Sequence, residues 1–171
     1  MRTWLALILG GLASASSMAA DMDITVQIPS LDVSEYHRPY VAIWIERPDN
    51  SVAANLAVWY QQKDTSEGAG TKWLADLRQW WRRSGREQSF PIDGVTGATR
   101  PVGQHTLHFT GGKAPLGELA AGPYRLVVEA AREVGGRELL NIPFDWPPSA
   151  SQHLSAQGKH ELGALALDLN P

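Results

Sequence analysis

Apolar and polar residues alternate with a period of two through most of the chain after residue 20. This alternation predicts strands with one face buried and the other exposed to water. In each predicted strand the apolar residues at every second position share a face. The strands are Ile24–Ile28, Val41–Ile45, Leu56–Tyr60, Leu107–Phe109, Tyr124–Val128, Leu140–Phe144 and Leu165–Leu169. In the third of them we expect Leu56, Val58 and Tyr60 on one face.

The segment 71–85 has the periodicity of an amphipathic helix instead. Its apolar positions follow the i, i+1, i+4, i+7, i+8 pattern of one helical face, and they are Trp73, Leu74, Leu77, Trp80 and Trp81. We expect Thr71 to cap this helix and Gly85 to end it. Because tryptophans at helical spacing are usually core residues, we expect Trp73, Trp80 and Trp81 to be buried. If a cofactor is attached nearby, one of them or Tyr60 is the candidate to cover its ring.

Turn residues separate the predicted strands. The glycine pair Gly135-Gly136 fits a tight hairpin because glycine accepts a positive φ, and Pro48-Asp49-Asn50 is a second turn signal. The stretches 111–122 and 145–158 are predicted to be loops. About seven strands and one amphipathic helix indicate a mainly β fold, an immunoglobulin-like β-sandwich. No linker divides the chain, so we expect a single β-sandwich domain over residues 21–171.

Residues 1–20 have the pattern of a signal peptide. Arg2 supplies a positive charge, Trp4 to Leu12 form an apolar stretch, and small residues run from Ser14 to Ala20. Cleavage is expected after Ala19 or Ala20. The apolar stretch is too short to span a membrane. Export combined with the absence of cysteine favours a bacterial periplasm.

Composition removes several classes of function. The chain has no cysteine, which excludes disulfides, thiolate metal sites and cysteine nucleophiles. Its 15 basic and 18 acidic residues provide no general basic field, so we expect no binding to nucleic acid. His105 and His108 are three apart in a predicted strand and should point to opposite faces; we expect no metal site. No serine-hydrolase nucleophile motif is present.

The charged residues have two interpretations. Arg82, Arg83 and Arg100 form a local basic concentration, either as a solvated helix end or as a contact for a phosphate or an acidic partner. Around the Gly135-Gly136 turn, cross-strand ion pairs are the expected arrangement. The residues concerned are Glu129, Arg132, Glu133, Arg137 and Glu138.

One loop, Asp93-Gly94-Val95-Thr96-Gly97-Ala98-Thr99, combines a carboxylate, two glycines and two hydroxyls. It resembles the flavinylation motif Asp-x-x-Ser/Thr-Gly-Ala-Ser/Thr of exported FMN-binding domains, over these seven residues alone. The resemblance implies that a magnesium-dependent FAD:protein FMN transferase esterifies the last hydroxyl with the phosphate of FMN. Thr99 is then the acceptor, with Asp93, Thr96, Gly97 and Ala98 as the rest of the motif. The alternative is an ordinary glycine-rich turn whose threonines bond their own backbone.

A second resemblance covers most of the chain after residue 20. The segments 40–46, 77–82, 93–99 and 127–133 look like an uncharacterised family of periplasmic proteins associated with PepSY-type membrane reductases and flavin transferases. This implies an electron carrier or accessory subunit rather than a stand-alone enzyme, with a part in iron reduction or uptake. The alternative is a cofactor-free binding or assembly module that contacts a membrane protein through a sheet edge or the tryptophan-rich helix.

Overall fold

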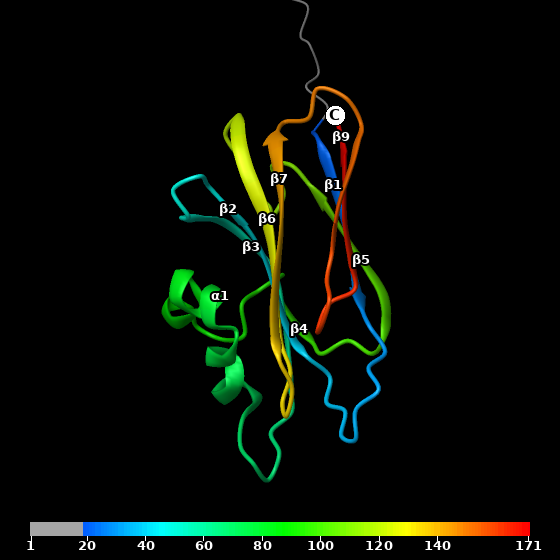
Figure 1. The fold of residues 1–171 in the computed structure, drawn as a ribbon. Coiled ribbons are helices and arrows are strands. Elements are labelled where there is room, and N and C mark those ends of the chain that lie inside the picture. Colours follow the sequence, from blue (N-terminus) through cyan, green and yellow to red (C-terminus); the bar gives the residue numbers. More distant parts are fainter. Residues whose placement is uncertain (1–18) are drawn as a thin grey trace, which may run out of the picture.

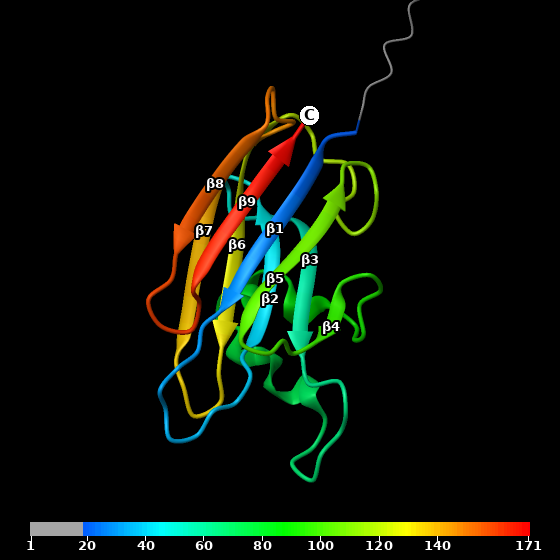
Figure 2. The same cartoon turned by 90° about the vertical axis from the view of Figure 1, so that its right-hand side faces the viewer.

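The computed structural model describes residues 19–171, and two sheets face each other in it (Figures 1 and 2). The first sheet has the order β5 (Gly103–Thr110), β1 (Asp21–Ile28), β9 (Ala164–Asn170), β8 (Gln152–Gln157). The second has the order β4 (Thr96–Ala98), β3 (Val52–Tyr60), β2 (Tyr40–Glu46), β6 (Gly122–Ala131), β7 (Arg137–Trp146). The predicted β-sandwich is confirmed. All of the predicted signal peptide except Ala19 and Ala20 lies outside the described residues.

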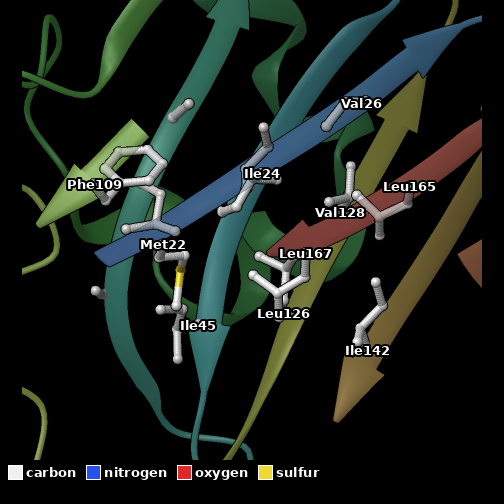
Figure 3. Close-up of a cluster of buried hydrophobic side chains, with 14 of the residues drawn as sticks. Met22, Ile24, Val26, Ile45, Phe109, Leu126, Val128, Ile142, Leu165 and Leu167 are labelled. Carbon is white, nitrogen blue, oxygen red and sulfur yellow. The ribbon is translucent and has the colours of Figure 1, made fainter. Parts of the chain in front are cut away.

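The main core fills the space between the two sheets. Figure 3 shows apolar side chains of β1, β5 and β9 meeting those of β2, β6 and β7. Six of the predicted strand faces are confirmed, because their alternate apolar residues all belong to this core or pack against it. The burial of these faces is the hydrophobic contribution that holds the two layers together.

The predicted face of β3 is wrong. Leu56 faces the main core, whereas Val58 and Tyr60 belong to a second cluster on the outer side of the sheet. The pairing of β2 with β3 shifts register here, because Ile43 lies opposite Ala57 and Trp44 opposite Asn55. The extra residue is a β-bulge, which reverses the alternation along the strand.

The interpretation of 145–158 as a loop is also wrong. β7 continues to Trp146, and β8 occupies Gln152–Gln157 and pairs with β9. β8 is an edge strand with only partly buried residues at alternate positions. It contains few strongly apolar side chains, so its sequence shows little of the pattern that identifies a buried strand.

The predicted helix is divided into two short pieces. A 3₁₀ helix, η1 (Gly70–Asp76), is followed by α1 (Arg78–Arg83), and both lie over the outer face of the second sheet (Figure 1). The cap at Thr71 is wrong, because η1 begins after Ala69 without a side-chain cap. Instead the buried Glu129 carboxylate of β6 accepts hydrogen bonds from the Gln79 and Trp80 backbone N–H groups at 3.0 and 2.8 Å. A short 3₁₀ turn, η2 (Gly85–Glu87), follows. In residues 19–171 no helix is long and apolar enough to cross a membrane.

The turn between β6 and β7 forms for a different reason than predicted. Neither Gly135 nor Gly136 has a positive φ, whereas Val134 has a φ of 52°. A side chain on Gly135 would meet the Arg132 guanidinium carbon at 2.5 Å. Glycine is therefore needed at position 135 for close packing. The predicted turn at 48–50 is confirmed, with Asn50 at a φ of 68°.

Candidate functional site

The motif segment begins with a tight turn. The Val95 N–H donates to the Ile92 carbonyl at 3.2 Å, and Gly94 takes a φ of +67° with no neighbour that an added Cβ would meet. The Ile92 N–H in turn donates to Thr96 Oγ1 at 2.8 Å. The Thr96 hydroxyl thus closes the turn, while the Asp93 carboxylate projects into solvent.

The turn leads into β4, which attaches the motif to the edge of the second sheet. β4 runs parallel to β3, with Gly97 opposite Trp59. A Cβ on Gly97 would lie 3.2 Å from Trp59 Cδ1, so glycine allows β4 to approach the indole closely. The Arg100 guanidinium lies over the same ring, 5.2 Å from its centroid, and the Gln62 side chain donates to the Gly97 carbonyl at 3.1 Å.

An aromatic cluster holds the start of the segment against the helices. Phe90 stacks on Trp81 with ring centroids 6.4 Å apart and meets Trp80 and Tyr60 at 6.1 and 6.0 Å. Trp80 is fully buried and donates through its indole N–H to Asn55. The expected burial is therefore confirmed for Trp80, and Trp81 is half-buried. Because Tyr60 is also buried, it is not available to cover a ring in solvent.

Thr99 differs from Thr96 in its surroundings. It is half-buried, follows the last residue of β4 and lies on the wall of a pocket of about 680 Å³. Within residues 19–171 its hydroxyl takes part in no side-chain hydrogen bond, in contrast to the Thr96 hydroxyl at the turn. Of the two motif hydroxyls, Thr99 is the one placed beside a ligand-sized space.

This pocket, called here the end pocket, extends across one end of the second sheet. Besides Thr99, its wall comes from three segments of the chain, within residues 36–40, 61–78 and 131–137. The second of these segments includes η1. These segments join the ends of β3, β2, β6 and β7 at the same end of the sheet, so the wall runs across all of these strands. With about 4.8 Å between neighbouring strands, the four spacings from β4 to β7 amount to about 19 Å.

Exposed apolar side chains gather at this end of the molecule. Trp73 is 41% exposed and Tyr36 37% exposed, and both line the end pocket, as does Val134 at 72%. The expectation that Trp73 is a core residue is therefore wrong. The segment 70–76 is a 3₁₀ helix with three residues per turn, whose buried residues are Gly70 and Leu74, and Trp73 lies off that face. The other exposed large apolar residues described, Val33 and Val102, lie in loops at the same end.

Two of the arginines that line the end pocket are fixed by ion pairs. Arg132 is buried and contacts Glu161 through Nε at 2.7 Å, and Arg137 contacts the buried Glu129 at 2.6 Å. The other two arginines of the wall, Arg38 and Arg78, have no ion-pair partner within 4.0 Å among residues 19–171. The charge pairing expected around the β6–β7 turn holds across the hairpin only for Arg137 and Glu129.

Two tyrosines of the end pocket remain protonated at neutral pH. Burial raises the pKa of Tyr36 and that of Tyr40 above the ordinary phenol value. The Tyr40 hydroxyl donates to the Gly70 carbonyl at 3.0 Å, which joins β2 to the start of η1. This bond fixes the position of η1, and therefore of Trp73, relative to the sheet.

The basic concentration expected from the sequence does not form around the motif. Arg83 pairs with Glu46 at the far end of β2, with Nε and Oε1 3.6 Å apart, and Arg82 donates to the Arg78 carbonyl. Only Arg100 lies beside the motif. The arginines that line the end pocket were missed because they come from separate parts of the sequence, and no local pattern connects them.

The rings of His37, His105 and His108 contact neighbouring residues. His105 and His108 point to opposite faces, as predicted: the His105 ring meets Trp59 edge-on, whereas His108 contacts Asp23 at 2.7 Å. His37, on the end pocket, contacts Glu35 at 2.8 Å. Within the part of the chain that the structure describes, no group of three or more His, Cys, Asp or Glu residues could hold a metal ion.

The end pocket suits the FMN that the motif implies. Its volume falls in the range of small-molecule sites, Thr99 offers an unengaged hydroxyl on its wall, and aromatic side chains stand exposed further along it. An added Cβ at Gly94 would meet nothing within 4 Å, so the turn before the motif threonines is also open to an approaching protein. The residues present therefore fit the group.

Comparison with known proteins gave one finding. The model of a family described as predicted periplasmic protein (DUF2271) matches residues 21–164. Neither a search of curated proteins nor a search of solved structures gave a match. The matched range includes both sheets up to the start of β9, the motif segment and the wall of the end pocket.

Proposed function

Since the chain belongs to this family of predicted periplasmic proteins, we propose that it is an exported flavin carrier with FMN joined to Thr99 through a phosphoester. The observation that carries the proposal is the contrast between the two motif threonines. The Thr96 hydroxyl is held by the Ile92 N–H at 2.8 Å, whereas the Thr99 hydroxyl, on the wall of the end pocket, has no hydrogen-bond partner among residues 19–171.

The attachment step uses a transferase and FAD. Thr99 Oγ1 attacks the phosphorus atom that belongs to the FMN half of FAD, and a new P–O bond forms. The bond between that phosphorus and the oxygen bridging the two phosphates breaks, so AMP leaves, and the hydroxyl proton passes to the base that the transferase provides. No change of oxidation state occurs, and magnesium in the transferase balances the phosphate charge.

The position of Thr99 supports this step. It directly follows a three-residue edge strand, so its backbone is not enclosed by a further strand of the sheet. The turn at Asp93-Gly94 is solvent-exposed, which leaves the motif open to a modifying enzyme. We propose that Asp93 is a recognition residue for the transferase, because its carboxylate has no hydrogen-bonded partner among the described residues.

Attached FMN would supply reversible one- and two-electron chemistry. The protein would hold the flavin outside the cytoplasm, between a membrane donor and a periplasmic acceptor. We propose a PepSY-type membrane reductase as the donor and iron reduction or uptake as the setting. The exposed apolar residues at the same end as Thr99 support a function that brings another molecule to this end.

Those exposed residues also favour the second candidate, a periplasmic binding module without a cofactor. Val33, Val102 and Val134 would then contact a partner protein directly. The two candidates differ in whether Thr99 carries a covalent group.

Co-expression with an FAD:protein FMN transferase tests the proposal. The wild-type band should fluoresce under ultraviolet light on a denaturing gel, because a phosphoester survives denaturation. Thr99→Ala should abolish the fluorescence. Thr99→Ser, which keeps a hydroxyl, should retain it, and Thr96→Ser should retain it as a matched control at the turn.

A wild-type band that does not fluoresce, together with an unchanged intact mass, would overturn the proposal in favour of the cofactor-free module. Fluorescence that persists in Thr99→Ala would overturn the assignment of the acceptor.

A further inference from the structure

We propose that the end pocket is the docking site for the isoalloxazine ring of the flavin carried by Thr99, and that Trp73 and Tyr36 stack against this ring. The inference rests on the proposed function and adds where the ring lies in the folded protein. It predicts a ring held on the protein surface rather than one that moves freely on its tether.

The shape of the end pocket fits a molecule attached at one end. Thr99 lies at the β4 side, and the wall continues past Gln61 and Tyr40 to Arg137 at the β7 side. FMN is elongated, with the phosphate at one end and the ring at the other. An anchor at the edge of a pocket that crosses about 19 Å of sheet directs the ring along the wall.

The aromatic side chains of the end pocket are only partly covered. The Lys72 ammonium lies 4.6 Å from the centroid of the Trp73 ring, and the Arg132 guanidinium lies 6.0 Å from that of Tyr36. Both rings nevertheless keep more than a third of their residue surface exposed, 41% for Trp73 and 37% for Tyr36. An exposed ring that is steadied by a cation is a suitable surface for stacking on a planar ligand.

The rim of the pocket retains a strained residue. Val134 takes a φ of 52° and is 72% exposed, although a β-branched residue is unfavourable in the left-handed region. Strained residues of this kind collect at ligand sites. An apolar side chain at this rim gains contact only when another molecule covers it.

Covalent attachment makes a weak docking site sufficient. A group on a short tether has an effective concentration in the millimolar range near its own anchor. At that effective concentration an intrinsic Kd of about 1 mM keeps the ring docked for about half of the time, whereas free flavin at micromolar concentration would need a Kd about a thousandfold lower. The end pocket therefore does not need the many polar contacts of a site that binds free FMN.

Fluorescence of the flavinylated protein tests the inference. In the native wild type we expect high flavin anisotropy, because the ring tumbles with the protein, and emission quenched by Trp73. Unfolding in urea should lower the anisotropy and raise the emission. Trp73→Ala and Tyr36→Ala should each raise native emission several-fold, whereas Trp81→Ala should not, because Trp81 packs on Phe90 outside the end pocket.

Each outcome bears on a separate claim. Covalent FMN with low native anisotropy and with emission indifferent to Trp73 and Tyr36 would overturn the inference and leave the proposed function standing. A protein without covalent FMN would overturn both. Circular dichroism of each variant confirms that a change in emission does not come from unfolding. Tyr36→Phe, which keeps a ring for stacking but cannot donate an electron to the excited flavin, should keep the high native anisotropy while raising the emission.

Discussion

At the scale of single residues, the two motif threonines have different surroundings. The resemblance to the flavinylation motif makes Thr99 the expected acceptor and Thr96 another residue of the motif, although the same pattern also fits an ordinary turn. The hydrogen bond from the Ile92 N–H to Thr96 Oγ1 makes Thr96 part of the turn. Thr99 is left beside the end pocket.

This difference predicts different costs of substitution. Thr96→Ala should lower the free energy of unfolding by about 1 kcal/mol, because it removes the hydrogen bond that closes the turn. Thr99→Ala should change it by less than about 0.5 kcal/mol. Urea denaturation of the protein without flavin measures both, and Thr96→Ser should recover most of the loss. A larger loss for Thr99→Ala than for Thr96→Ala would show that Thr99 has the structural part.

The glycines show that residue type alone does not predict backbone conformation. Gly94 takes a positive φ in its turn, but Gly135 and Gly136, for which a positive φ was predicted, do not. Gly135 is required because the Arg132 guanidinium packs against it. The Arg132 side chain is itself fixed by Glu161, 29 positions further along the sequence. The residues of the turn alone therefore could not predict this contact.

At the scale of elements, the sequence predicts faces well where a strand is regular and buried. The apolar residues of β1, β6 and β9 were assigned to the correct side by alternation alone. In β3 the bulge beside Leu56 reversed the alternation, and β8, at a sheet edge, has too few apolar residues to be recognised. The bulge depends on how β3 pairs with β2, and β8 is held in place by its pairing with β9, so neither feature is visible in the strand's own residues.

The junction after α1 gives a prediction at this scale. A Cβ on Gly85 would lie 2.6 Å from Trp80 Cζ3, and Trp80 is fully buried. Gly85→Ala should therefore lower the free energy of unfolding by about 1 to 3 kcal/mol, since overpacking displaces a core side chain. Thermal unfolding checks this.

The matched control is Gly117→Ala. Gly117 has a φ of +64° and open space around it, so the substitution introduces backbone strain without a clash. The near-ultraviolet circular dichroism signal of the tryptophans should change in Gly85→Ala and should not change in Gly117→Ala. An unchanged tryptophan signal in both variants would show that the helix end accommodates the methyl group without moving Trp80.

At the scale of the whole molecule, the end pocket forms where loops from distant parts of the chain meet. Residues 36–40, 61–78, 99 and 131–137 are neighbours only because β4, β3, β2, β6 and β7 are ordered side by side. The sequence identified Thr99 through its motif. It could not identify Tyr36, Arg38 or the exposed position of Trp73, because these depend on the fold.

A carboxylate that joins the two sheets predicts the acid stability of the molecule. Glu138 of β7 accepts hydrogen bonds from the backbone N–H groups of Lys159, His160 and Leu162 at 2.7, 3.0 and 2.9 Å. Burial acts to raise the pKa of Glu138, but these donors outweigh it and hold the pKa below its ordinary value of 4.5. The stabilisation is therefore complete above that value and is lost as the pH falls through the lowered pKa.

Urea unfolding at a series of pH values from about 6 to about 3 measures this loss. Glu138→Gln should be less stable than the wild type at pH 6 and should show a weaker fall below pH 4.5. Asp49 serves for comparison, because its lowered pKa comes from Ser51 in an exposed turn; Asp49→Asn should leave most of the acid dependence in place. An equal acid dependence in Glu138→Gln and the wild type would contradict the assignment.

The most direct test of the central claim is peptide mass spectrometry of the protein purified after co-expression with an FMN transferase. Trypsin does not cut between Arg100 and Pro101, so the motif is contained in the peptide 87–113. We predict that this peptide gains the mass of one FMN phosphoester and that fragmentation assigns the gain to Thr99. An unmodified peptide, or a gain assigned to Thr96, would contradict the account.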